Sequence, residues 1–534
     1  MEQTGDSRLA VVGVVSMAFI GVLLIFLFPG SPEQDVDYHF LMARTAWVDH
    51  FYFVDVWGRP LFTTLFAPAA LLGFIPARFL ALAISLAAAW QTYRLASDLR
   101  VSRAWLVIPF LLGQQTFFEL YSNLFTEPLF ALILVVALRC QISGRIKSGM
   151  LVASFLPLAR PEGVFLCLFW GLWILILPER QTSPGHLKRP EAMSDRVGAS
   201  ENAANERERG VQAGTENSRK EAQKTRNKEV VYLPVYRRVV NRLPSMVILA
   251  SGVVIWWFAA LLLTGDPLFI LHNWPATWHT DMYGHGTFLS YAQRSQEFAG
   301  VILIVPFIVG LLLGFRSWNW VLVTAVFLVL FLLHSIFVRY GLFGEAGFPR
   351  YMVSVAPAIA VLTLEGWNPI FLVKILRPLA IVAGWVVVIF SILQSVHYLD
   401  SMIWERDAVA IDEMANWLEQ QHSSLPDLIW SHGRMCITLK GNLKDSPPAA
   451  NREKLITLLE KAPTGTIVFW DNEIGPNWFG TTSAEIEGRG YKLLTRRHYS
   501  LPALIFPPGR FPAIALLFPP IPSREIELSL LQKR

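Results

Sequence analysis

The sequence predicts a polytopic α-helical membrane protein that ends in a small α/β domain outside the membrane. Hydrophobic residues make up 53% of the 534 residues and charged residues only 16%, and the mean hydropathy is +0.41. Soluble globular chains carry roughly 25% charged residues, so this composition excludes an ordinary soluble protein. Apolar runs near the roughly 20 residues needed to cross a bilayer recur until about residue 395, where a more polar region begins.

Length and hydropathy predict about eleven transmembrane helices within residues 1–395. The first apolar run has no A-x-A-like cleavage site after it, which favours a retained signal anchor. The expected spans are residues 9–28, 78–96, 104–121, 125–140, 148–159, 163–178, 244–264, 298–315, 317–338, 351–365 and 378–395.

The orientation of these spans depends on residues 60–74, an apolar stretch that is short for a crossing. If it crossed, the basic clusters within residues 94–103 and 139–147 would face outward, against the positive-inside rule. A helix that lies along the interface instead puts both clusters inside. We therefore expect a cytoplasmic N-terminus, an outer loop over residues 29–77 with juxtamembrane helices, and an extracytoplasmic C-terminal domain.

Residues 179–243 form a hydrophilic insertion that is rich in Arg, Lys, Glu and Asn. Low hydrophobicity and dense mixed charge predict a cytoplasmic, disordered segment, to which we assign no chemistry. The net charge of +5 comes from Lys and Arg between the apolar runs. We interpret this basicity as a topological signal and not as a sign of nucleic-acid binding.

Residues 396–534 predict the α/β domain. Helical spacing at 407–421 and 452–462 alternates with strand-like patterns at 427–433, 464–473 and 491–500, which indicates a parallel or mixed sheet. The loop WDNEIGPNWFG brings Trp470, Trp478 and Phe479 together with acidic residues. These aromatic residues would suit sugar stacking, but we favour packing in the core beside a turn.

The first outer loop holds the main candidates for chemistry. SPEQDVDYHF, residues 31–40, places Asp35 and Asp37 directly after the first apolar run. Two such carboxylates can bind a divalent cation, or one can take a proton from an acceptor hydroxyl while the other orients it. Both residues also precede an amphipathic stretch, so helix capping is the alternative.

The order of segments in the membrane region resembles that of GT-C-type glycosyltransferases. These polytopic enzymes use polyprenyl-phosphate sugars and include protein O-mannosyltransferases and aminoarabinose transferases. The similarity covers most of residues 1–395, but neither the insertion nor the tail. It rests on the acidic outer loop, WGRPLFTTLFAPAALLGF, FTEPLFALILVVALR, LARPEGVFLCLFW, TGDPLFILHNW and FPRYMVSVAPAIAVL.

The resemblance implies a transmembrane catalytic domain in which a first-loop aspartate is the base. That role carries over to Asp35, with Asp37 as the second candidate. Some family members use a divalent metal, such as Mg²⁺ or Mn²⁺, and others use none; Asp35 and Asp37 would be its ligands here.

The implied activity is hexosyl transfer, for example of mannose, from a polyprenyl-phosphate donor to a hydroxyl of a glycan, lipid or protein acceptor. Transfer would occur by inverting displacement on the extracytoplasmic face, and we favour a bacterial plasma membrane over the endoplasmic reticulum. A transporter or flippase of lipid-linked substrates and an inactive GT-C-like scaffold are the alternatives. Few ionisable residues lie in the middle of the predicted spans, which argues against transport.

The leaving phosphate requires cations. Arg59 is our first choice because it begins the interfacial stretch and its guanidinium can bind phosphate through two hydrogen bonds. Snorkelling to the interface is the alternative for Arg59. Arg350 and then Arg339, in the outer turn before the tenth span, are further choices, each with an ordinary loop position as the alternative.

The loop HNWPATWHTDMYGHG, residues 272–286, supplies further candidates for donor binding. His272 and His279 could contact phosphate, and Trp274 or Trp278 could stack on a sugar. Anchoring in the aromatic belt of the membrane is the more common role for such tryptophans. Pro275 and the glycines of the loop break any helical frame for a histidine metal site.

Three ionisable residues stand at the outer ends of other spans. Glu127 begins a span and is a functional candidate, with helix capping by Thr126 and Glu127 as the alternative. Arg160 and Glu162 in ARPEG are expected to pair with each other at a helix start.

Overall fold

The computed structural model describes a mostly helical chain with one small sheet. The described residues are 2–28, 33–176, 240, 242–275, 278, 284–372, 382, 386, 389, 393, 406–422, 427–446, 451–501 and 523–534. The chain divides into two compact units, Met1–Phe169 together with Ile248–Arg534, and Trp170–Val247. Most of the predicted insertion 179–243 and of the predicted span 378–395 lies outside the described residues.

Within the described part of the chain, four helices are long and apolar enough to cross a bilayer. They are α1 (Glu2–Leu27), α4 (Phe74–Asp98), α13 (Met246–Thr264) and α18 (Trp318–Tyr340). Helices satisfy their backbone hydrogen bonds internally, which is what a lipid environment requires. The protein is therefore an integral membrane protein.

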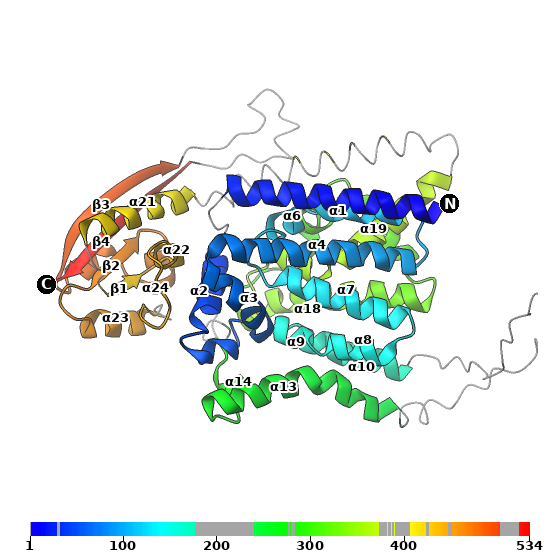
Figure 1. The fold of residues 1–534 in the computed structure, drawn as a ribbon, viewed down its shortest axis with the longest axis horizontal. Coiled ribbons are helices and arrows are strands. Elements are labelled where there is room, and N and C mark those ends of the chain that lie inside the picture. Colours follow the sequence, from blue (N-terminus) through cyan, green and yellow to red (C-terminus); the bar gives the residue numbers. More distant parts are fainter. Residues whose placement is uncertain are drawn as a thin grey trace, which may run out of the picture. The chain divides into compact units, whose positions relative to one another are not determined.

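The predicted number of about eleven crossings is not confirmed, because several predicted spans are divided into shorter elements. Residues 104–121, for example, form a 3₁₀ turn and two six-residue helices. Figure 1 shows α1, α4, α7 and α8 running side by side. The remaining helical elements of the membrane region are α2 (Gln34–Thr45), η1 (His50–Phe53), α3 (Pro60–Leu72), η2 (Ala104–Leu106), α5 (Val107–Leu112), α6 (Gln115–Leu120), α7 (Glu127–Ile142), α8 (Ile146–Ala153), α9 (Leu156–Ala159), α10 (Gly163–Ile176), η3 (Leu243–Ser245), α14 (Phe269–His272), α15 (Ser290–Gln293), α16 (Ser295–Ala299), α17 (Ile304–Leu313), η5 (Leu342–Gly344), η6 (Pro349–Val355) and α19 (Ala356–Leu372).

The short apolar stretch after the first loop forms a helix of its own. Helix α3 has 13 residues and begins with Pro60, whose missing N–H is not needed in the first turn. It ends at Gly73, where φ is 123°, a value that favours glycine, and α4 starts at the next residue. The chain thus turns between α3 and α4 without a longer loop.

The C-terminal region forms a mixed four-stranded sheet with the strand order β1-β2-β4-β3. Strands β1 and β2 pair in parallel, and β4 pairs antiparallel with both β2 and β3. Strand β4, which the sequence analysis missed, lies between β2 and β3. The elements are α21 (Arg406–Gln421), β1 (Leu428–Trp430), α22 (Gly433–Thr438), α23 (Arg452–Lys461), β2 (Ile467–Asp471), α24 (Ile474–Phe479), α25 (Ser483–Glu487), β3 (Tyr491–Leu501) and β4 (Arg524–Lys533).

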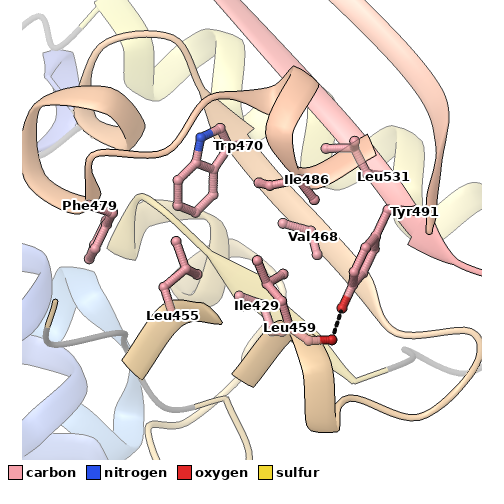
Figure 2. Packing of buried hydrophobic residues seen from close by; sticks show 9 residues of the cluster. All are labelled: Ile429, Leu455, Leu459, Val468, Trp470, Phe479, Ile486, Tyr491 and Leu531. Atoms are coloured by element: carbon pink, nitrogen blue, oxygen red, sulfur yellow. Dashed lines mark hydrogen bonds between the residues drawn. The ribbon is translucent and has the colours of Figure 1, made fainter. Parts of the chain in front are cut away.

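The core of this domain lies between the sheet and the helices α23, α24 and α25 (Figure 2). Trp470 and Phe479 belong to it, with ring centroids 5.6 Å apart. The Tyr491 hydroxyl donates to the Leu459 carbonyl oxygen at 2.8 Å, which satisfies a polar group at the edge of an apolar cluster (Figure 2).

The C-terminal domain packs against α2, the helix of the first loop. The Leu443 N–H donates to Thr45 Oγ1 at 2.9 Å, and the Arg44 guanidinium donates to the Lys440 carbonyl at 2.7 Å. The rings of Tyr38 and Trp430 lie with centroids 5.4 Å apart. The domain therefore contacts the helix that carries the candidate carboxylates.

Candidate active site

A cavity of about 320 Å³ lies between the first loop, the ends of several helices of the membrane region and helix α24. This volume is near the lower end of the range of about 300–1,000 Å³ that is usual for small-molecule sites. Ten of the 24 residues that line it carry acidic or basic side chains. They are the carboxylates Glu33, Asp35, Glu127, Glu162 and Glu345, the arginines Arg59, Arg160 and Arg350, and the histidines His39 and His334.

Asp35 lies in the first turn of α2 and faces this cavity. Its carboxylate forms an ion pair with Arg350, which also pairs with Glu33. Burial raises the pKa of the Asp35 carboxyl to about 6; Glu127 adds to this shift, and Arg59 and Arg160 oppose it. No side chain caps α2, because Glu33 at the N-cap position makes no capping hydrogen bond. The capping alternative for Asp35 is thus not observed.

Asp37 lies on a different face of α2 and does not line the cavity. It is fully buried, and its Oδ2 is 3.7 Å from His432 Nδ1 of the C-terminal domain. Residues two apart on an α-helix point about 200° away from each other. The D-x-D spacing therefore places Asp35 and Asp37 on different faces of α2. The two carboxylates do not reach the same ligand in the cavity.

No group of three or more His, Cys, Asp or Glu side chains that could hold a metal ion is found among the described residues. The separation of Asp35 from Asp37 is in line with this result. No ligand set for Mg²⁺ or Mn²⁺ therefore emerges from the described part of the first loop.

Arg59 is held in an unusual backbone conformation by a hydrogen-bonded turn. Its φ is 59°, in the region that non-glycine residues seldom adopt. Just before it, Asp55 accepts hydrogen bonds from the Gly58 N–H at 2.6 Å and from the Asn273 side chain at 2.9 Å. Thr63 donates to the Gly58 carbonyl at 2.7 Å. This strained position is the kind that clusters at functional sites.

The Arg59 side chain is partly buried at the cavity wall. One terminal nitrogen donates to the Val56 carbonyl at 2.7 Å, and the guanidinium lies 5.3 Å from the ring centroid of Trp278. Its Nε has no hydrogen-bond partner among the described residues. Burial lowers the pKa of Arg59 to about 10, with Arg160 adding to the shift, so the group stays charged at neutral pH.

The candidates from the loop after α13 are dispersed. Trp278 lines the cavity, whereas Trp274 does not; the two indole rings are in contact, with their centroids 5.5 Å apart. His272 pairs with Asp266 at 2.8 Å, its side chain is 62% exposed, and it does not line the cavity. His279 lies outside the described residues. Of the described candidates from this loop, Trp278 is the one that lines the cavity.

The predicted pair of Arg160 and Glu162 is confirmed, with a distance of 2.7 Å. Arg160 also pairs with Glu127 at 2.5 Å and donates to Thr126 Oγ1 at 3.0 Å. Thr126 makes no capping hydrogen bond to α7. Burial opposes ionisation of Glu162, but the charge of Arg160 outweighs it and lowers the pKa of Glu162 to about 2. Arg160 is thus neutralised by two carboxylates.

His334 and Glu345 were not among the site residues predicted from the sequence. His334 Nδ1 lies 2.8 Å from Glu345 Oε2, and His334 Nε2 lies 3.6 Å from Glu162 Oε1. The Tyr291 hydroxyl donates to the other Glu345 oxygen. A histidine in the apolar run of α18 was the available signal, because ionisable residues in such runs mark functional sites. His334 thus connects Glu162 and Glu345, two carboxylates from loops that are distant in the sequence.

Arg339, the weakest arginine candidate, does not line the cavity. Its guanidinium lies 6.0 Å from the ring centroid of Tyr340, the next residue along the chain. The other two arginine candidates, Arg59 and Arg350, meet in the cavity with Asp35.

The chain is similar to known proteins in its structure. No protein-family model matches the chain, and no curated protein matches it. Among solved structures, it is similar to ArnT from Cupriavidus metallidurans in the apo state, with a TM-score of 0.56 and 11% identity over 93% of this chain and 97% of that chain. The same protein bound to undecaprenyl phosphate gives a TM-score of 0.54 and 12% identity over 88% of this chain and 94% of that chain.

Proposed function

The chain has the GT-C-like fold of ArnT, an aminoarabinose transferase, and from this premise we propose that it is a membrane glycosyltransferase that uses a polyprenyl-phosphate sugar. The proposed reaction transfers a hexose, such as mannose, to an acceptor hydroxyl on the extracytoplasmic face. The observation that supports it best is the meeting of Asp35 with Arg59 and Arg350 in one cavity. One of the similar ArnT structures holds undecaprenyl phosphate, which supports this class of donor.

Asp35 is the proposed general base. A base works best when its pKa is near the working pH, and burial raises the pKa of Asp35 to about 6. In the inverting displacement, Asp35 takes the proton of the acceptor hydroxyl while the acceptor oxygen attacks the anomeric carbon. The bond from that carbon to the phosphate oxygen breaks on the opposite face, and the electron pair leaves with the polyprenyl phosphate.

The two available arginines are proposed to stabilise the leaving phosphate. Arg59 has an unpaired Nε in the described structure, and Arg350 is shared between two carboxylates. A phosphate would compete with Asp35 for Arg350, which would free the carboxylate for the acceptor. Arg160 also pairs with two carboxylates, but both of them are buried, whereas the two partners of Arg350 are partly exposed; we therefore assign Arg160 the role of organising the cavity wall.

Asp37 is proposed to position α2 and not to act as base. It faces His432 of the C-terminal domain and lies away from the cavity. Trp278 is proposed to contact the sugar, with Trp274 supporting it through the contact of their rings. His272 is too exposed, and too far from the cavity wall, to be proposed as a phosphate ligand.

The test uses the purified full-length protein with a panel of radiolabelled polyprenyl-phosphate sugars and a broad acceptor extract, with and without a chelator. We expect acceptor-dependent transfer from one donor. In Asp35→Asn the rate of this transfer should fall by about 10²–10⁴-fold, which is the usual contribution of general-base catalysis. Asp37→Asn should lose less. Asp266→Asn, which changes a carboxylate outside the cavity, is the matched control.

The outcomes separate the classes of protein. If no donor is consumed and the lipid crosses vesicles intact, a transporter or flippase is the better description. If no donor is consumed and none is moved, a scaffold is favoured. Loss of activity with the chelator would require a metal in the reaction.

A further inference from the structure

We propose that Trp478, on α24 of the C-terminal domain, is the platform on which the sugar ring of the donor lipid stacks. This inference rests on the proposed function and extends it to the sugar. Trp478 and Ile474 line the same cavity as Asp35 and the arginines. The residue comes from a part of the chain to which the resemblance seen in the sequence did not extend.

Helical spacing explains why Trp478 faces the cavity and its neighbour does not. Residues four apart share a face of an α-helix, so Ile474 and Trp478 lie together, as do Gly475 and Phe479. Phe479 is 5% exposed and packs in the domain core near Trp470 (Figure 2). Trp478 is 42% exposed and lines the cavity. The two aromatic residues thus have different roles.

Helix α24 is held tightly enough to present this ring in one place. Asp471 accepts hydrogen bonds from the N–H groups of Glu473, at 2.9 Å, and Ile474. A side chain at Gly475 would overlap the Trp470 indole, so glycine permits the close approach of α24 to the core. Gly480 ends the helix with φ at 57°.

The domain as a whole is held against α2 by contacts that do not involve α24. The hydrogen bonds from Leu443 to Thr45 and from Arg44 to Lys440 join the C-terminal domain to the helix that begins beside Asp35. Helix α2 therefore positions both residues. It carries the proposed base Asp35, and it packs against the domain that carries Trp478.

The chemistry of the cavity fits a single sugar attached to a phosphate. The arginines can hold the phosphate, and the carboxylates can accept hydrogen bonds from sugar hydroxyls. The face of an indole ring is large, rigid and apolar, and it suits the C–H face of a pyranose. A volume of about 320 Å³ is within the usual range for small-molecule sites and accommodates a sugar ring.

The experiment measures binding of three probes to the full-length protein: undecaprenyl phosphate mannose, undecaprenyl phosphate glucose and undecaprenyl phosphate without sugar. In Trp478→Ala we expect the dissociation constant of the hexosyl lipid that wild type consumes to rise about three- to tenfold, from the usual strength of aromatic pairs. The affinity for the lipid without sugar should not change. Trp478→Phe should keep most of the affinity, and Tyr499→Ala, which alters an aromatic residue of the same domain outside the cavity, should match wild type.

Two results would overturn the proposal while leaving the glycosyltransferase assignment intact. One is unchanged affinity of Trp478→Ala for the hexosyl lipid, including the case in which only the KM for the acceptor rises. The other is an equal loss for the lipid with and without sugar, because that would show an effect on the phosphate or on the fold. If wild type neither binds nor consumes any polyprenyl-phosphate sugar, the proposed function fails, and this inference fails with it.

Discussion

Arg350, in the turn before α19, forms an ion pair with Asp35 at the start of α2, 315 positions earlier in the chain. The guanidinium also lies 4.9 Å from the ring centroid of Phe348 and 5.2 Å from that of Phe125. Arg350 also pairs with Glu33, so an incoming phosphate would bind this buried cation by taking the place of a carboxylate.

The rate of sugar transfer should fall as the pH decreases through about 6. The base must be deprotonated, and burial raises the pKa of Asp35 to about 6, so the protonated, inactive fraction grows below that value. In the acidic limb of the pH profile, below this pKa, we expect kcat/KM to fall about tenfold for each pH unit. A rate that stays constant down to about pH 4, the ordinary value for aspartate, would contradict the assignment.

Replacement of Arg350 should weaken binding of the donor phosphate and lower kcat together. We expect Arg350→Ala to lower kcat/KM by about 10²-fold or more, because a buried charged hydrogen bond and transition-state stabilisation are both lost. Arg350→Lys should recover only part of this, since lysine lacks the planar fork. Arg339→Ala, outside the cavity, should behave like wild type in the same kinetic assay.

Asp55 should act through Arg59 and not by contact with substrate. Asp55→Ala leaves the Gly58 N–H and the Asn273 amide without their acceptor, which should lower the free energy of unfolding by about 1–3 kcal/mol. Because Arg59 is displaced, we expect a higher KM for the donor and the same pH limb as wild type. Asp266→Ala serves as the control. A shift of the pH limb would mean that Asp55 itself takes part in proton transfer.

Gly433 should be required for the contact between α2 and the C-terminal domain. A Cβ at this position would lie 2.9 Å from the Cβ of Asp37, closer than such atoms approach. Gly433→Val should therefore lower the stability of the protein by about 1–3 kcal/mol through overpacking. Thermal unfolding would measure this loss. Gly488→Ala, where the nearest atom would be 3.5 Å away, should be tolerated.

The residues of the site that could be predicted from the sequence are those in loops beside recognisable apolar runs. Asp35, Arg59 and Arg350 all meet in the cavity, and Arg160 pairs with Glu162 as expected. Asp37 was harder to judge, because adjacency in sequence does not show that α2 turns its side chain toward His432. The contact of His334 with Glu162 arises from tertiary packing, which no local pattern records.

The same distinction holds for the fold. The helices at residues 407–421 and 452–462 and three of the four strands of the small sheet follow from local periodicity. Strand β4 was missed, although Arg524–Lys533 alternates in part, because its place between β2 and β3 depends on pairing with distant segments. Trp470 and Trp478 share one motif, and only the packing of α24 decides which of them is buried.

Whether Asp35 is the base is best decided by measuring donor binding and single-turnover sugar transfer for Asp35→Asn beside wild type. We expect the variant to bind the polyprenyl-phosphate sugar within about threefold of wild type but to transfer it at least about 10²-fold more slowly. Transfer by Asp35→Asn at a rate within about threefold of wild type would contradict the claim that this carboxylate is the base.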